Sequence, residues 1–297
     1  MGKCSLTVAL PVLSCCGVET SVLPTAVLST HTGGFTGFTY RDLTDDLLPM
    51  AEHWKQVGCR FQSLYSGFLG SAGQIGLVEQ IFDWFREENT LVMVDPVMGD
   101  GGKLYKTYTS EMAERHGPLV PPGGHRGAQH DRGCHLLGRP YNPGPYTQRE
   151  IEEILQGLCA MGPKMAVLTG VWLQEGALGT ACYDSQVGEA KLFLTDRIEG
   201  FYHGTGDLFA SALLGGLLNG APLEEACALA RSSPGAPLRP PLKRAQTTAS
   251  APSSSAICLA GGEDGGTGAK TNRKPSEASV KVFGETFFQK SFEPLPL

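Results

Sequence analysis

The sequence predicts an α/β fold in which helices lie on both sides of a mostly parallel central sheet. Helical and strand patterns alternate along the first 231 of the 297 residues, and such alternation is typical of parallel sheets. Several expected strands are continuous apolar runs, as in strands that are buried on both faces. With 41% hydrophobic and 18% charged residues, the chain can bury the core of one large domain. We therefore expect a single three-layer αβα domain over residues 1–231.

The local patterns predict the elements in order. The apolar stretch 5–16 suits a buried helix, and 22–28 suits a buried strand that ends in a polar loop. Residues 44–56 open with a cap-like Thr44 and early acids, which are typical of a helix start. The expected elements that follow are a strand at 63–68, a helix at 71–85, a strand at 90–95, a helix at 147–161, a strand at 165–170, a strand pair at 179–184 and 190–195, a helix that starts near Gly204 and a helix at 223–231.

Two stretches interrupt this alternation. Between His116 and His135 the chain carries four of its seven histidines and has no apolar period, although an α/β protein should have a strand there. After Arg231 the composition becomes rich in Pro, Ser and Ala, which predicts a low-complexity, disordered tail over residues 232–297. Within that tail only residues 280–292 could form a short strand.

Composition and charge exclude several classes of protein. A net charge of −6 and a pI near 5.7 argue against a protein that binds nucleic acid or a membrane surface. The sequence lacks both a long apolar run and a secretory signal pattern, so we expect a cytoplasmic protein. The nine cysteines are scattered without a C-x-x-C pair, which predicts neither a disulfide framework nor a zinc site. A small-molecule enzyme fits these observations best.

The clearest functional signal is a glycine-rich turn that leads into an apolar helix. Gly204, Thr205 and Gly206 precede Asp207 and the run LFASALLGGLL. The first N–H groups of a helix lack intrahelical partners and bind anions, and glycines let a phosphate approach them. A carboxylate beside that phosphate could accept the proton of an attacking hydroxyl. The alternative is an ordinary turn in which Asp207 caps the helix.

Further polar residues follow the expected strands, where open parallel sheets bind their ligands. Asp95 and Asp100 share one glycine-rich loop, and two carboxylates near a phosphate suggest Mg²⁺. The alternative is a solvated acidic turn. At the end of another strand, Thr169 and Gly170 could meet a nucleotide phosphate, although a threonine at a strand end is also unremarkable.

A third group could clamp a flat aromatic ring by stacking and hydrogen bonds. It comprises Ser29, His31, Thr32 and Phe68, from two strand ends. A single aromatic residue of this kind lies more often in a core than in a site, so Phe68 has weight only as a member of the group. The P-loop pattern and the dinucleotide-binding pattern G-x-G-x-x-G after a first strand are both absent.

In these residues the chain resembles the ribokinase-like family, and within it the bacterial vitamin B6 kinases. Five blocks occur in the family's order, namely TAVLSTHTGGF, YSGFLGS, DPVMGDGGKLY, VLTGV and YHGTGDLFASALL. The resemblance implies ATP- and Mg²⁺-dependent phosphorylation of the 5′-hydroxymethyl group of pyridoxal, pyridoxine or pyridoxamine. Because dimerisation is common in the family, it also implies a possible homodimer.

The resemblance also implies a role for each candidate residue. Asp207 would be the general base, and the amides of Gly204, Thr205 and Gly206 would form an anion hole. Asp95 and Asp100 would organise Mg²⁺ and the phosphates. Thr169, with Gly170, would contact ATP, and His31, Thr32 and Phe68 would lie on the pyridine ring with Ser29 beside them.

The chain departs from the family in three places. One of them is the stretch after Arg231, where the family continues with helices that cover the adenine side of the nucleotide site and this chain becomes rich in Pro, Ser and Ala. Family members begin with a central strand and a Ser-Gly turn ahead of the GKCSLT block, and we expect both to be missing. Where the family has a strand and a Pro-Asn-x-x-Glu motif beside the metal and the nucleotide, residues 117–134 differ. We interpret this segment as an out-of-frame translation, because a shifted reading permits the family's motif. Metal binding by its histidines has poor spacing.

Two other functions stay open at the level of sequence. The first is a kinase of the same fold that acts on hydroxymethylpyrimidine. The second is an inactive remnant of a B6 kinase, which binds nucleotide weakly or does not fold because apolar surface is left uncovered.

Overall fold

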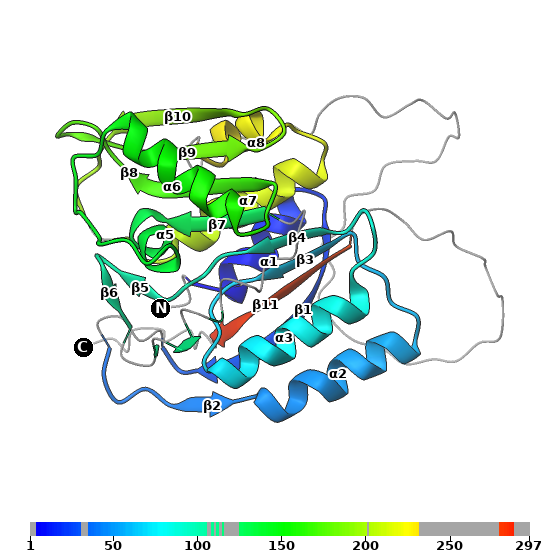
Figure 1. Cartoon of the computed structure of the whole chain (residues 1–297). Coiled ribbons are helices and arrows are strands. Elements are labelled where there is room, and N and C mark those ends of the chain that lie inside the picture. The colour runs from blue at the N-terminus through cyan, green and yellow to red at the C-terminus, as the bar shows by residue number, and fades with distance from the viewer. Residues whose placement is uncertain are drawn as a thin grey trace, which may run out of the picture.

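The computed structural model describes residues 4–30, 35–105, 108–109, 111–112, 115, 125–200, 202–231 and 279–287. Its main feature is one nine-stranded sheet in the order β10-β9-β8-β7-β4-β3-β11-β1-β2 (Figure 1). The pairs from β8 through β7, β4, β3 and β11 to β1 are parallel, and the outer pairs are antiparallel. The strands are β1 (Glu19–Leu28), β2 (Tyr40–Asp42), β3 (Ser63–Ser66), β4 (Leu91–Val94), β7 (His125–Gln129), β8 (Met165–Val171), β9 (Ala177–Asp184), β10 (Glu189–Asp196) and β11 (Ser279–Phe287). A separate hairpin joins β5 (Gly99–Asp100) to β6 (Lys103–Leu104).

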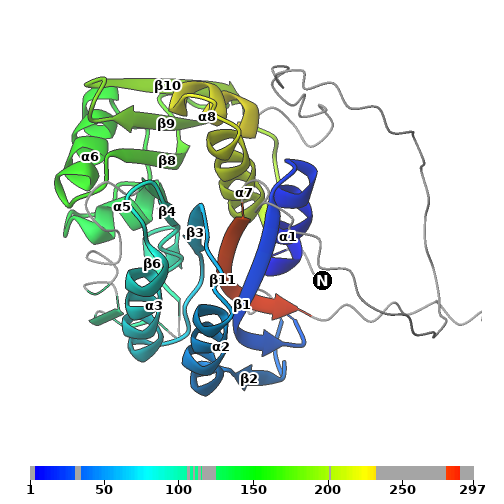
Figure 2. The same ribbon diagram turned by 90° about the vertical axis from the view of Figure 1, so that its right-hand side faces the viewer.

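Helices cover both faces of the sheet, which confirms the predicted α/β class (Figure 2). On one face α1 (Leu6–Cys15), α7 (Thr205–Leu218) and α8 (Leu223–Arg231) contact one another in succession. On the other face lie α2 (Thr44–Gln56), α3 (Ala72–Phe85), α5 (His130–Leu136) and α6 (Gln148–Ala160).

The core alternates along the strands because successive side chains point to opposite faces. Tyr65 and Met93 pack in the cluster beneath α1, α7 and α8. Their neighbours Leu64 and Val92 pack in the cluster beneath α2 and α3. The central strands are therefore buried on both sides, as their apolar sequences predict.

Most predicted elements are present within a few residues of their expected bounds, and α2 and α8 match at both ends. The expectation that Thr44 caps α2 is wrong. Thr44 is already helical, and the preceding Leu43 makes no side-chain capping bond. Instead the Asp42 carboxylate accepts the Thr44 N–H at 2.7 Å, so the acceptor comes from the end of β2.

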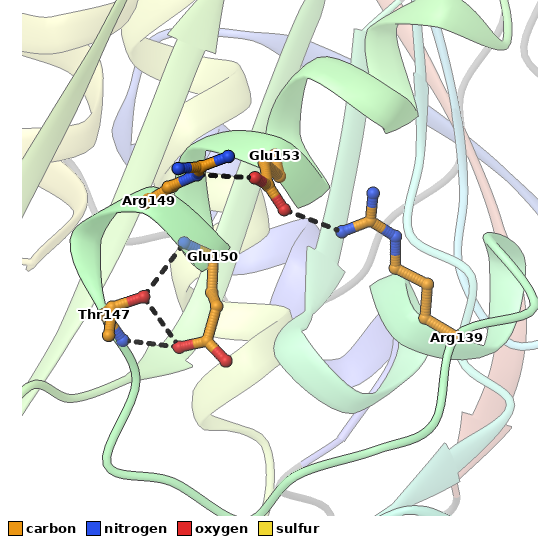
Figure 3. A network of polar contacts seen from close by, with 5 residues as sticks. All are labelled: Arg139, Thr147, Arg149, Glu150 and Glu153. Atoms are coloured by element: carbon orange, nitrogen blue, oxygen red, sulfur yellow. Dashed lines mark hydrogen bonds and ion pairs between the residues drawn. The ribbon is translucent and has the colours of Figure 1, made fainter.

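The helix α6 starts with a capping box that Figure 3 shows from close by. The Thr147 N–H donates to the Glu150 carboxylate at 2.7 Å, and the Glu150 N–H donates to the Thr147 hydroxyl at 3.2 Å. One turn later Glu153 pairs with Arg149 at 2.9 Å and with Arg139 at 3.7 Å. Because Arg139 follows α5, the second pair ties the segment after α5 to α6 (Figure 3).

Part of the segment between His116 and His135 forms regular secondary structure. Residues 125–129 form β7, which pairs in parallel with β4 and β8, and α5 follows it directly. The absence of an apolar period did not prevent a strand, because two neighbouring strands offer backbone hydrogen bonds on either side. Whether residues 117–134 are translated out of frame stays a prediction that the coding DNA decides.

The centre of the sheet contains a strand from the far end of the chain. β11 pairs in parallel with β1 from Glu19↔Ser279 to Leu28↔Phe287, and with β3 on its other side. Most of β11 lies within residues 280–292, the one stretch of the expected tail that could form a strand, and disorder of the tail stays a prediction. The expected gap in the sheet is filled by β11; the rest of the expected tail, 232–278 and 288–297, lies outside the described residues.

The cysteines in the described ranges form no disulfide with one another. No helix in the described part of the chain is long and apolar enough to cross a membrane.

Candidate active site

The predicted anion-binding turn forms the start of α7. Gly204 has a φ of 81°, in the left-handed region that favours glycine, and precedes the first helical residue Thr205. It makes no side-chain capping bond, so the amides of Thr205 and Gly206 have no side-chain acceptor from Gly204 at the positive end of the helix dipole, whereas the Asp207 N–H donates to its own carboxylate. The Thr205 hydroxyl donates to the Tyr202 carbonyl at 3.3 Å and fixes the turn. The arrangement suits a phosphate.

Asp207 lies in this first turn and is half-buried. Burial, with a smaller contribution from the nearby Asp95 carboxylate, raises the pKa of its carboxyl to about 6. The Ser5 N–H donates to the carboxylate, and this bond and the Arg132 guanidinium oppose the rise in pKa. A pKa near 6 lets Asp207 be ionised at neutral pH and still accept a proton, as a general base requires.

Asp95 follows the buried strand β4 directly and is 7% exposed. Its backbone N–H donates to the Ser66 carbonyl of β3 at 2.8 Å, so its place at the carboxyl edge of the sheet is set by the main chain. Burial raises the pKa of the Asp95 carboxyl, and the Arg132 guanidinium counteracts that rise.

Arg132 is a residue of this site that the sequence did not indicate. It lies on α5, and its side chain and that of Asp95 are each 9% exposed. The Nη1 atom lies 3.1 Å from Asp95 Oδ1, and Nε donates to the Gly99 carbonyl at 3.1 Å. One guanidinium therefore bridges the end of β4 and the start of β5.

Tyr65 completes this group from β3. Its pKa is raised well above the usual value by burial and by the carboxylates of Asp95 and Asp207, whereas Arg132 lowers it. The same charged groups thus act on the Tyr65 hydroxyl and on one another. The fold brings Asp95, Asp207, Arg132 and Tyr65 into one neighbourhood, although they are far apart in the sequence.

The loop after Asp95 is a tight hairpin. Gly101 and Gly102 have φ values of 60° and 76°, as the turn between β5 and β6 requires. A side chain at Gly99 would collide with the Lys103 carbonyl across the hairpin. The backbone of Asp100 lies in β5, but its side chain is outside the described part of the structure.

Thr169 and Gly170 lie near the end of β8, at a bulge between Thr169 and Val171 where Gly170 has a φ of 75°. Two residues further on, Trp172 borders a cavity of about 520 Å³. Its other lining residues are Glu175, Gly176, Ala177, Arg197, Glu199 and Gly200. The cavity therefore lies between the end of β8 and the segment that leads to the start of α7.

The predicted ring-binding group is described only in part. Ser29 follows β1, is exposed and accepts the Thr39 N–H at 2.9 Å. Phe68 follows β3 and is half-buried. His31 and Thr32 lie outside the described residues, so the structure does not test whether the four side chains meet.

The sequence signals for the residues that were missed differ. Arg132 lies in the anomalous segment and had no local signal. Tyr65 lay within an expected strand, where an aromatic residue suggests core. Trp172 follows the VLTGV block directly, so a search around that block could have found it.

The comparisons with known proteins bear on the fold and the family. The fold is that of a ribokinase-like kinase. The chain belongs to the phosphomethylpyrimidine kinase family, whose model matches residues 58–233.

Several relatives are similar over most of the chain. It is 29% identical over 248 residues to a pyridoxine/pyridoxal/pyridoxamine kinase of Bordetella avium (strain 197N), which covers 76% of each chain. A Bacteroides thetaiotaomicron protein whose crystal form contains pyridoxal is 34% identical, with a TM-score of 0.74 over 77% of this chain and 80% of the other. The pyridoxal kinase of Lactobacillus plantarum is 30% identical, with a TM-score of 0.70 over 77% and 81%.

Proposed function

We propose that this chain is an ATP-dependent pyridoxal kinase, which transfers the γ-phosphoryl group of ATP to the 5′-hydroxymethyl group of pyridoxal, pyridoxine or pyridoxamine. The observation that carries the proposal is Asp207, with its raised pKa, in the first turn of α7 beside the glycine turn. The proposed catalytic unit is a three-layer domain with a mostly parallel central sheet, formed by residues 1–231 together with β11.

The chemistry needs one base and one anion site. Asp207 accepts the proton of the substrate hydroxyl while the hydroxyl oxygen forms a bond to the γ-phosphorus, and the bond from that phosphorus to the β–γ bridging oxygen breaks to release ADP. The amides of Thr205 and Gly206 stabilise the charge on the transferred phosphoryl oxygens. The proposed transfer is direct and uses no nucleophilic side chain. Catalysis is then mainly a matter of positioning and electrostatics.

The cavity beside β8 supports a nucleotide site. Its Trp172 indole offers a flat apolar surface for a purine, and Arg197 brings a cation. The Trp172 Nε1–H donates to the Pro143 carbonyl at 3.1 Å, which fixes the ring plane. Thr169 and Gly170 come just before Trp172 in the chain, so they lie beside this cavity, where a nucleotide phosphate could reach them.

Mg²⁺ would accompany the ATP phosphates and offset their charge. No group of three His, Cys, Asp or Glu side chains gathers in the described part of the chain, so Mg²⁺ would be held there by at most one or two carboxylates together with the phosphates. Asp95, one of the two predicted ligands, is instead paired with Arg132. A homodimer and a cytoplasmic location, the remaining parts of the proposal, are tested by sedimentation and by fractionation of cells.

A coupled assay for ADP tests the proposal. We expect turnover with ATP and pyridoxal, the formation of pyridoxal 5′-phosphate by mass spectrometry, and a much lower kcat/KM for hydroxymethylpyrimidine. A hydroxymethylpyrimidine kinase would instead have the higher kcat/KM for hydroxymethylpyrimidine. The pyridoxal in the crystals of the 34%-identical Bacteroides protein favours the B6 substrate.

A thermal melt separates an enzyme from an inactive remnant. A cooperative transition that both ATP and pyridoxal shift upward supports the kinase. A broad transition that neither ligand moves contradicts it.

A further inference from the structure

The position of the Asp95 carboxylate raises a question about its role. In the expected scheme Asp95 helps to hold Mg²⁺, and a metal ligand needs an oxygen that can turn toward the ion. In the structure the Oδ1 atom lies 3.1 Å from the Arg132 guanidinium, and both side chains are buried. An arginine remains charged at all accessible pH values, so this partner is permanent.

The second contact of the same guanidinium extends the argument. Arg132 Nε donates to the Gly99 carbonyl, the first residue of the β5–β6 hairpin. The planar guanidinium thus holds the end of β4 and the start of the hairpin at a fixed separation, which the point charge of a lysine could not do. Gly101 and Gly102, both with positive φ, join the two strands of the hairpin in a two-residue turn, so the start of β5 and the end of β6 are held close together.

The place of Arg132 in the sequence also bears on the metal. It lies in the segment where the resemblance implies a glutamate beside the metal. A cation in that segment repels Mg²⁺ and attracts phosphate oxygens, which is the opposite preference.

We propose that Arg132 is a positioning residue, which holds Asp95 and the β5–β6 hairpin in place at the edge of the phosphoryl-transfer site, and that Asp95 is not a direct metal ligand in this chain. The inference rests on the proposed kinase function. Asp95 and Arg132 then act as one unit, and the metal is bound through the nucleotide.

The test is a double-mutant cycle with two measurements. The variants are Asp95→Asn, Arg132→Gln and the double variant, with Arg132→Lys as the matched control that keeps the charge and loses the planar contact. The first measurement is kcat with pyridoxal. The second is Mn²⁺ affinity in the presence of a non-hydrolysable ATP analogue, by electron paramagnetic resonance, which requires no turnover.

If the proposal is right, each single neutral variant lowers kcat by about 100-fold, as a small misplacement does. The double variant is then no slower than the slower single variant, because the pair acts as a unit. Arg132→Lys falls between these variants and the wild type. The Mn²⁺ affinity changes by less than threefold in Asp95→Asn.

A tenfold loss of Mn²⁺ affinity in Asp95→Asn, or losses in kcat that multiply in the double variant, would overturn the proposal. If Arg132→Gln does not fold, the Asp95→Asn and double variants, which leave no buried carboxylate unpaired, still decide the question through Mn²⁺ binding. A wild-type chain that neither turns over nor binds Mn²⁺ with the nucleotide would refute the kinase function itself, an outcome distinct from failure of this inference.

Discussion

The carboxylate that follows β4 and the carboxylate in the first turn of α7 lie in one neighbourhood, but their partners differ. Asp95 is buried and paired with the Arg132 guanidinium at 3.1 Å. Asp207 accepts a backbone N–H from Ser5, and no cation forms an ion pair with it among the described residues. A carboxylate held by a guanidinium is fixed in place, whereas one held by an amide can exchange a proton near neutral pH. Under the proposed function, Asp95 is then a positioning acid and Asp207 the general base.

The largest expected effect comes from removing the charge of the Asp207 carboxylate. We expect Asp207→Asn to lower kcat by about 10²- to 10⁴-fold, since a general base is lost while the shape of the side chain is kept. In the wild type kcat/KM should fall as the pH is lowered through about 6, where Asp207 becomes protonated. Steady-state rates between pH 5 and 8 measure both. A variant as fast as the wild type would remove Asp207 from its role.

The same substitution should stabilise the fold at neutral pH. The pKa of Asp207 is higher in the folded chain than its usual value of 3.8. The stability that its protonated form contributes is therefore full below pH 4 and is lost as the pH rises through 6. Asp207→Asn should add about 2 kcal/mol above pH 6, after allowing for the partial exposure of the side chain, and little at pH 4. Urea melts at the two pH values measure this gain, and an equal gain at both would contradict it.

A change in the cavity should affect nucleotide binding without involving either carboxylate. We expect Trp172→Ala to raise the KM for ATP about tenfold through the loss of a stacking surface. The KM for pyridoxal and the pH dependence should not change. Trp172→Phe, which keeps a ring, is the matched control and should lie close to the wild type. A larger effect on pyridoxal than on ATP would place the ring of the substrate in this cavity instead.

The smallest expected effect lies far from both carboxylates, in the capping box of α6. Thr147→Ala removes the hydroxyl that accepts the Glu150 N–H (Figure 3). We expect the free energy of unfolding to fall by about 1 kcal/mol and kcat to stay the same. Denaturant melts measure the free energy of unfolding, and the pyridoxal assay measures kcat. A change in kcat would mean that α6 communicates with the site.

The sequence predicted the helices and strands whose formation depends on side chains close together in the chain. The apolar strand at Leu91–Val94 and the amphipathic α6 follow from side-chain periodicity alone. The strand at His125–Gln129 does not, because its place depends on backbone partners from β4 and β8, which no window of sequence contains.

The same division holds for the site. Gly204 and Asp207 were predictable, since a glycine turn and the helix after it are adjacent in the chain. The pairing of Asp95 with Arg132 joins residues that are 37 positions apart through two buried side chains. Only the packing of α5 against the sheet brings them together.

The placement of β11 has a consequence for how the protein is made. Its pairing with β1 joins residues from the two ends of the chain (Figure 1). On the ribosome, β1 emerges long before β11, so the middle of the sheet cannot close until residues 279–287 have been synthesised. Until then β1 and β3 expose unpaired edges, and contacts of such long sequence separation form slowly. A premature stop before Ser279 would leave these edges open permanently.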